Sequence, residues 1–179
     1  DGQNEIFISF RADTNTPDYF LYCLNGNDLS IKFKAVADRW VRNTGVYSMR
    51  SGDIDGDGAD EVIAQMIQSI TDNNNTLIID LDDNGNPIVD TAFHNFSGLG
   101  LDLEDMNGDG TKDIVASNGL GIVKSFDYKN DSLIWEKQVS DYSINCLRIY
   151  NVDPDSTKEL VVIDDGALSI YDLDEDSLK

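Results

Sequence analysis

The sequence has few of the residues on which catalytic and redox sites commonly depend. Its 179 residues include one histidine, His94, and two cysteines, Cys23 and Cys146. The cysteines lie in apolar runs far apart in the chain, which favours small buried side chains over a disulfide. No Cys/His metal pattern and no G-x-S-x-G motif accompany them. We therefore expect His94 to be structural or exposed, not a catalytic base.

Positive charge is also scarce. Lys and Arg number 13 against 34 Asp and Glu, and the formal net charge is −21. Phosphate contacts to nucleic acid require a basic surface, so we expect no nucleic-acid partner. No run of 18 apolar residues is present, and nothing in this segment predicts insertion into a membrane.

Acidic residues instead gather at a regular spacing in the stretch DIDGDGADEVI, residues 53–63. Acids occupy positions 1, 3, 5 and 9, and glycines, which tolerate the positive φ of a tight loop, occupy positions 4 and 6. A hard dication takes oxygen ligands from such side chains and from the carbonyl of position 7. The predicted Ca²⁺ ligands are Asp53, Asp55, Asp57, Ala59 and Glu61.

The same pattern recurs at intervals of about 50 residues, which indicates an array of supersecondary units. DMNGDGTKDIV predicts a second Ca²⁺ site at Asp105, Asn107, Asp109, Thr111 and Asp113. A third copy, NVDPDSTKELV, and a half copy, DGQNEIF, add Asn151, Asp153, Asp155, Glu159, Asp1 and Glu5. Because Pro154 and Ser156 replace the glycines of the third copy, we expect that site to be the weakest or empty.

Short β-rich runs surround each loop, and no segment shows sustained helical periodicity. One strand is expected before each loop, at 46–52, 98–104 and 144–150. A second is expected after each loop, at 6–10, 62–67, 114–117 and 160–163. Third strands are expected at 19–24, 77–81, 122–128 and 168–173, and fourth strands at 31–35, 88–93 and 133–137. The first unit then lacks its first strand, and the last unit lacks its fourth.

Several of these strands are continuously apolar, which indicates burial on both faces. Sheets stacked face to face around an axis provide such burial, and a linear β-solenoid would need shorter and more regular repeats. We therefore predict an all-β β-propeller with four-stranded antiparallel blades and the ion loop between the first two strands. About 3.5 blades of a larger propeller are expected, at 1–40, 45–95, 97–139 and 143–179.

The two central copies resemble the FG-GAP/VCBS-type repeat of integrin-α-like propellers, although the FG-GAP dipeptides themselves are not evident. The resemblance implies Ca²⁺ in a hairpin loop of each blade and an extracellular or cell-surface protein for adhesion or ligand binding. An EF-hand is excluded, because its twelfth position requires a bidentate Glu and here that position is Ala64 or Ala116.

Two functions stay open. The first is a non-enzymatic, calcium-stabilised module whose partners are a protein or carbohydrate ligand and the remainder of the propeller or a partner chain. The second is part of a secreted polysaccharide lyase or hydrolase, since some calcium-loaded propellers of similar motif are enzymes. We favour the first, because no cluster of His, Arg, Lys and Tyr suited to a channel mouth stands out. Sequons at Asn74, Asn95 and Asn130 agree with secretion.

Overall fold

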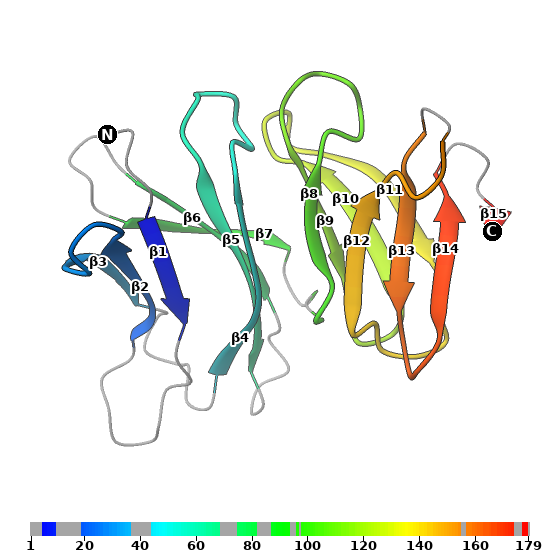
Figure 1. Ribbon diagram of the computed structural model, residues 1–179, viewed down its shortest axis with the longest axis horizontal. Helices are drawn as coiled ribbons and strands as arrows, with labels where there is room; N and C mark the ends of the chain where they lie inside the picture. Colours follow the sequence, from blue (N-terminus) through cyan, green and yellow to red (C-terminus); the bar gives the residue numbers. More distant parts are fainter. Residues whose placement is uncertain are drawn as a thin grey trace.

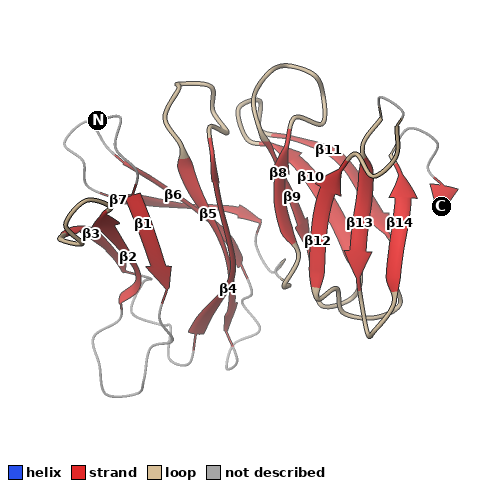
Figure 2. Ribbon diagram, in the orientation of Figure 1, coloured by secondary structure: helices blue, strands red, loops and turns tan. Residues whose placement is uncertain are grey.

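The protein is built from strands and loops (Figure 2). The structure, a computed structural model, describes residues 5–9, 19–36, 44–68, 75–81, 87–93, 96, 98–154, 157–173 and 177–178. Within these residues there is no helix, and hence none that could cross a membrane. All strand pairs are antiparallel. The predicted all-β class is therefore confirmed.

Four sheets follow one another in the sequence, and each is a meander of consecutive strands. The first sheet contains β1 (Glu5–Ser9), β2 (Tyr19–Asn25) and β3 (Ile31–Val36). The second contains β4 (Thr44–Gly52), β5 (Glu61–Gln68), β6 (Asn75–Leu81) and β7 (Pro87–Phe93). The third contains β8 (Leu101–Glu104), β9 (Asp113–Ser117), β10 (Ile122–Asp127) and β11 (Ser132–Gln138). The fourth contains β12 (Cys146–Tyr150), β13 (Glu159–Ile163), β14 (Leu168–Asp172) and β15 (Ser177–Leu178).

The strands differ from the sequence-based expectation mainly at their ends. β8 begins at Leu101 instead of residue 98, and the preceding Gly100 donates its backbone N–H to the Ser117 hydroxyl. No fourth strand was expected in the last sheet, yet β15 pairs with the end of β14. Within the described residues none of the four sheets closes on itself.

The second sheet is buried on both faces, as its apolar strands predicted. Val62 and Ala64 on β5 pack with Leu21 of the first sheet. Ile63, between them in the sequence, faces the other way and packs with Leu101 of the third sheet. Because successive side chains of a strand point to opposite faces, β5 contributes to two hydrophobic cores at once.

The third sheet repeats this arrangement. On β9, Ile114 and Ala116 face the second sheet, while Val115 faces Leu147 of the fourth sheet. The three β9 side chains and Leu147 are all fully buried. The sheets therefore stack face to face in chain order along the long axis of the molecule (Figure 1).

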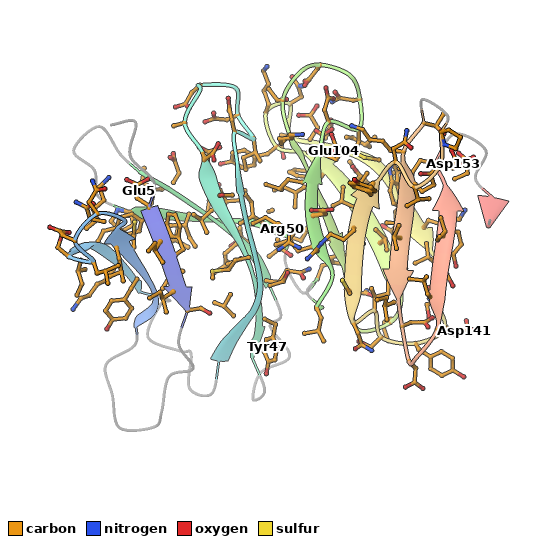
Figure 3. All side chains as sticks on the ribbon, viewed as in Figure 1. Glu5, Tyr47, Arg50, Glu104, Asp141 and Asp153 are labelled. Atoms are coloured by element: carbon orange, nitrogen blue, oxygen red, sulfur yellow. The ribbon has the colours of Figure 1, made fainter. Side chains whose placement is uncertain are left out.

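One carboxylate on β8 joins three sheets near their first strands. Asp102 Oδ1 lies 3.3 Å from Arg50 Nε of β4, and Oδ2 accepts the backbone N–H of Ile149 on β12 at 2.7 Å. Figure 3 shows Arg50 in the space between the second and third sheets. Polar contacts therefore supplement apolar packing where the first strands meet.

The two cysteines are free thiols. Cys23 on β2 is fully buried, as expected for a small apolar side chain. Cys146, at the start of β12, is only half-buried. His94 lies outside the described residues, so its structural role stays a prediction.

The bridge through Asp102 leads to a test of the stacking. We expect Asp102→Ala to lower the free energy of unfolding by about 1–3 kcal/mol, because the Ile149 N–H loses its acceptor and Arg50 loses its carboxylate partner while it keeps its bond to the Met49 carbonyl. Glu136→Ala, which removes an exposed ion pair with Lys124 inside the third sheet, should change it by less than about 0.5 kcal/mol. Urea unfolding followed by circular dichroism measures both, and equal effects would contradict a stacking role for Asp102.

Candidate metal centre

The first acidic loop joins β4 to β5 and is wound around the carboxylate of Asp53. Asp53 Oδ1 accepts the backbone N–H of Gly56 at 2.6 Å, and Oδ2 accepts that of Gly58 at 3.0 Å. Both glycines have positive φ, 85° and 90°. A residue with a Cβ rarely adopts this conformation, which explains the two glycines in the motif.

The next two acids tighten the same loop. Asp55 Oδ1 accepts the N–H of Asp57 at 3.0 Å, and Asp57 Oδ1 accepts the N–H of Ala59 at 2.7 Å. Short polar side chains commonly bond the backbone two residues later in turns. The side chains of positions 1, 3 and 5 are therefore held by the loop backbone.

The second loop, between β8 and β9, repeats the pattern bond for bond. Asp105 accepts the N–H groups of Gly108 and Gly110 at 2.6 and 2.9 Å. Asn107 Oδ1 accepts the N–H of Asp109 at 2.9 Å, and Asp109 Oδ1 accepts that of Thr111 at 2.8 Å. The two glycines again have positive φ, 79° and 90°. The two loops, which have the same residues at positions 1, 4, 5 and 6 and differ at the other five, thus adopt one conformation.

In the second, third and fourth sheets the ninth-position acid starts the second strand, and its side chain turns back into the loop. Glu61 Oε2 accepts the backbone N–H of Ile54 at 3.0 Å. Asp113 Oδ2 accepts that of Met106 at 2.7 Å, and in the third loop Glu159 Oε2 accepts the N–H of Val152 at 2.8 Å. In all three loops the donor is the residue at position 2.

The other oxygens of two of these acids have no hydrogen-bond partner. Glu61 and Asp113 are 2% and 0% exposed, and Glu61 Oε1 and Asp113 Oδ1 are buried without a partner. An unsatisfied buried polar group costs about 1–3 kcal/mol, and a charged one costs more. Burial, with a smaller contribution from neighbouring acids, raises the pKa of Glu61 to about 7 and that of Asp113 to about 6.

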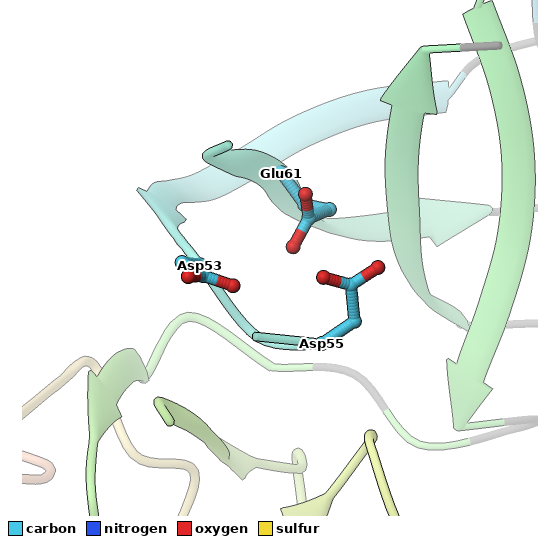
Figure 4. Close-up of side chains that lie close together, drawn as sticks. All are labelled: Asp53, Asp55 and Glu61. Carbon is cyan, nitrogen blue, oxygen red and sulfur yellow. The ribbon is translucent and has the colours of Figure 1, made fainter. Parts of the chain in front are cut away.

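In the first loop, carboxylate oxygens from three acids lie close together. Asp53, Asp55 and Glu61 each offer an oxygen, and these atoms lie within 4.8 Å of one another. Figure 4 shows the three side chains pointing toward the same point. Calcium binds oxygens at about 2.3–2.6 Å, so two ligands of one ion lie at most about 5 Å apart. The donor set therefore fits a hard cation.

The remaining predicted ligands of the first two loops do not belong to this group of three converging carboxylates. Asp57 and Ala59 lie on the exposed part of the first loop, and Asp57 is not one of the three converging carboxylates. In the second loop an amide, Asn107, takes the place of an acid at position 3, while Thr111 is buried and donates its hydroxyl to Asp109. Among the described residues, only the first loop brings three acids this close.

The two weaker copies are described only in part. Asp1 and Asp155 lie outside the described residues. Glu159 is fully buried, whereas Asn151 is exposed and Asp153 half-buried beside Pro154. Glu5 on β1 forms an ion pair with Lys32 of β3, across the intervening β2. Glu5 therefore already has a cationic partner, and the predictions for these two copies stay untested.

Sequence reasoning missed an acid on the third strand of the second, third and fourth sheets: Asp80, Asp127 and Asp172. In the fourth sheet, Asp172 pairs directly with the ninth-position Glu159. Asp80 and Asp127 raise the pKa of Glu61 and Asp113, respectively, as secondary contributions to the effect of burial. Each of these acids stands near the end of its strand. Its position shows that it faces the ninth-position acid only once the strand register is known.

Comparison with known proteins adds no family assignment. No model of a known protein family matches the chain, and no curated protein matches it either. The resemblance to calcium-binding propeller repeats therefore rests on the sequence motif alone.

The buried charge on Glu61 predicts opposite effects of one substitution with and without metal. The folded-state pKa, about 7, lies above the ordinary value of 4.5. In chelator, the stability contributed by the protonated group is therefore present below about pH 4.5 and lost as the pH rises through about 7. Glu61→Gln avoids this loss, so at about pH 8 it should melt higher than the unsubstituted chain in chelator.

With about 2 mM calcium the order should reverse, because a neutral amide is a poorer ligand than a carboxylate. Each 1 kcal/mol corresponds to roughly 2–4 °C for a chain of this size, which differential scanning fluorimetry resolves. Glu136→Gln, at an exposed position of β11, is the matched control and should not reverse. The same order in chelator and in calcium would contradict a metal ligand at Glu61.

Proposed function

We propose that this chain is part of an extracellular, calcium-stabilised β-propeller that acts as a structural, adhesive or ligand-binding module. The observation that carries the proposal is the pair of buried, unpartnered oxygens on Glu61 and Asp113. They occupy the same position in two loops that share five backbone-to-side-chain hydrogen bonds. A divalent cation supplies the missing partner and offsets the repulsion among the surrounding acids.

Calcium fits this donor set better than magnesium. Magnesium demands near-ideal octahedral geometry and usually keeps several waters, whereas calcium accepts six to eight oxygens in flexible arrangements, backbone carbonyls included. Extracellular calcium modules bind with dissociation constants of about 10⁻⁴–10⁻³ M. At about 1–2 mM calcium, a site of about 0.1 mM adds about 1.5 kcal/mol to the free energy of unfolding. An ion bound with this affinity would stabilise the fold at extracellular calcium concentrations, as the proposed structural role requires.

The stacking of the sheets supports a propeller with further blades. Ile63, Val115 and Val161 each stand two residues after a ninth-position acid. Ile63 and Val115 are fully buried against the next sheet. Val161 belongs to the open face of the last sheet, where the paired Ile163 and Leu168 are 40% and 63% exposed. Another sheet, from the remainder of the propeller or a partner chain, would cover this apolar face, and twisted sheets stacked in this way fan around an axis.

A hollow of about 360 Å³ between the third and fourth sheets supports the ligand-binding part of the proposal. Trp135, Lys137, Tyr171 and Asp172 line it. Its volume suits a small ligand, and an aromatic side chain beside charged groups suits a carbohydrate. The Lys137 ammonium lies 5.6 Å from the centre of the Tyr171 ring, and the Tyr171 hydroxyl donates to the Val139 carbonyl. The polar edges of this hollow are thus held in place.

No observation on the described residues favours the alternative, a polysaccharide lyase or hydrolase, over a binding module. Incubation with pectin-like acidic glycans distinguishes the two, and we expect no depolymerisation. Glu136 and Asp172 are the acids that line the hollow. Depolymerisation that is abolished by Glu136→Gln or Asp172→Asn would establish an enzyme and overturn the proposed module.

The metal part of the proposal predicts two calcium ions per chain. Isothermal titration calorimetry should count two, and Asp57→Ala or Asp109→Ala should each lower the count to one or weaken one site. Chelator should lower the melting temperature of the unsubstituted chain. Asp60→Ala, which removes an exposed acid at the non-ligand eighth position of the first loop, is the control and should still bind two. No binding, or no effect of chelator, would make the loops ordinary acidic turns.

A further inference from the structure

An acid or amide faces the ninth-position acid across the strand ladder in all four sheets. In the second sheet Val62 pairs with Ile79, and this register places Asp80 opposite Glu61. Glu5 pairs with Asn25 and Glu159 pairs with Asp172. In the third sheet Phe126 pairs with Ile114, and this register places Asp127 opposite Asp113. Like charges directly opposite on neighbouring strands are unfavourable, so an arrangement that recurs in this way calls for a cationic or hydrogen-bonding explanation.

The Asp127 carboxylate is buried and accepts three hydrogen bonds. The side chain is 3% exposed. Oδ1 accepts the backbone N–H of Asn130 at 3.0 Å. Oδ2 accepts Nδ2 of Asn107 at 2.9 Å and Nδ2 of Asn130 at 2.8 Å. Three donors thus converge on this one carboxylate, and one of them belongs to the third position of the second loop.

The bond to Asn107 fixes which end of that amide faces the loop. A carboxylate accepts hydrogen bonds but donates none, so the NH₂ group of Asn107 must face Asp127. Oδ1 of Asn107 is then directed into the loop, where it accepts the N–H of Asp109. Without this constraint the amide could turn and present hydrogens to the space that a cation would occupy.

The first loop needs no such device, because its third position is Asp55, whose two oxygens are both acceptors. The second loop also contains the independent sign of a missing ligand, since Asp113 Oδ1 is fully buried without a partner. The amide at position 3 of the second loop and Asp127 on β10 therefore form a donor–acceptor pair. Asp55 and Asp80 cannot form such a pair, because an ionised carboxylate donates no hydrogen bond.

We propose that Asp127 is a positioning residue for the second ion: it holds the Asn107 amide with its oxygen toward the metal without touching the metal. This inference rests on the proposed calcium binding of the loops. Outer partners that orient metal ligands typically contribute about 10–100-fold to affinity, so the contribution of Asp127 is measurable.

The test uses the full chain with Glu61→Gln in the first loop, so that calcium binding by calorimetry reports the second loop. In this background we expect Asp127→Asn to weaken calcium binding about tenfold or more, because the substituted amide can turn its own NH₂ toward Asn107. Asp131→Asn removes the same charge from an exposed position in the adjacent turn, and Asn tolerates its positive φ of 49°. This control should change affinity by less than about twofold.

The double substitution Asn107→Asp with Asp127→Asn separates positioning from charge. It keeps the total charge and reverses the donor and acceptor of the bond, so we expect it to recover the lost affinity. An effect of Asp127→Asn no larger than that of Asp131→Asn, or no recovery in the double variant, would overturn the positioning role while calcium binding stands. Absence of calcium binding in the Glu61→Gln background itself would overturn the proposed function and this inference together.

Discussion

Two carboxylate oxygens that are buried without a hydrogen-bond partner, on Glu61 and Asp113, are the constraint on which the rest of the structure depends. Each acid begins the second strand of a sheet, where the neighbouring sheets keep water away. Glycines at positive φ and a series of backbone N–H donors wind both loops in the same way, and in the first loop Asp53, Asp55 and Glu61 bring oxygens within 4.8 Å of one another. From loop geometry and burial together we propose that a divalent cation is the partner of these oxygens.

The ion loops are also tied to the joints between sheets. The Lys112 backbone N–H in the second loop donates to the Asp53 carbonyl in the first at 3.1 Å. Glu104, just before the second loop, accepts from Lys112 and from Lys158 of the third loop. A cation that fixed one loop would thereby restrain its neighbours, and for this reason the role that we propose for the metal is structural.

Much of the fold could be predicted from the sequence because its signals are local. The spacing of acids and glycines identified the loops at 53–61 and 105–113, and apolar runs such as that on β9 indicated burial on both faces. Contacts that depend on strand register could not be predicted in this way. Asp127 meets Asp113 only because β10 pairs with β9, and Glu5 meets Lys32 only because β1 and β3 flank β2. The bridge from Asp102 to two other sheets has no local signal at all.

The central claim is that a divalent cation lies between Asp53, Asp55 and Glu61. X-ray diffraction from crystals grown with a calcium-like lanthanide, recorded at its absorption edge, tests it most directly. The account predicts an anomalous peak among these three carboxylates, with Glu61 Oε1 as a ligand, and a second peak beside Asp113. A well-ordered first loop with no anomalous peak, and water or a protein donor bonded to Glu61 Oε1, would contradict it.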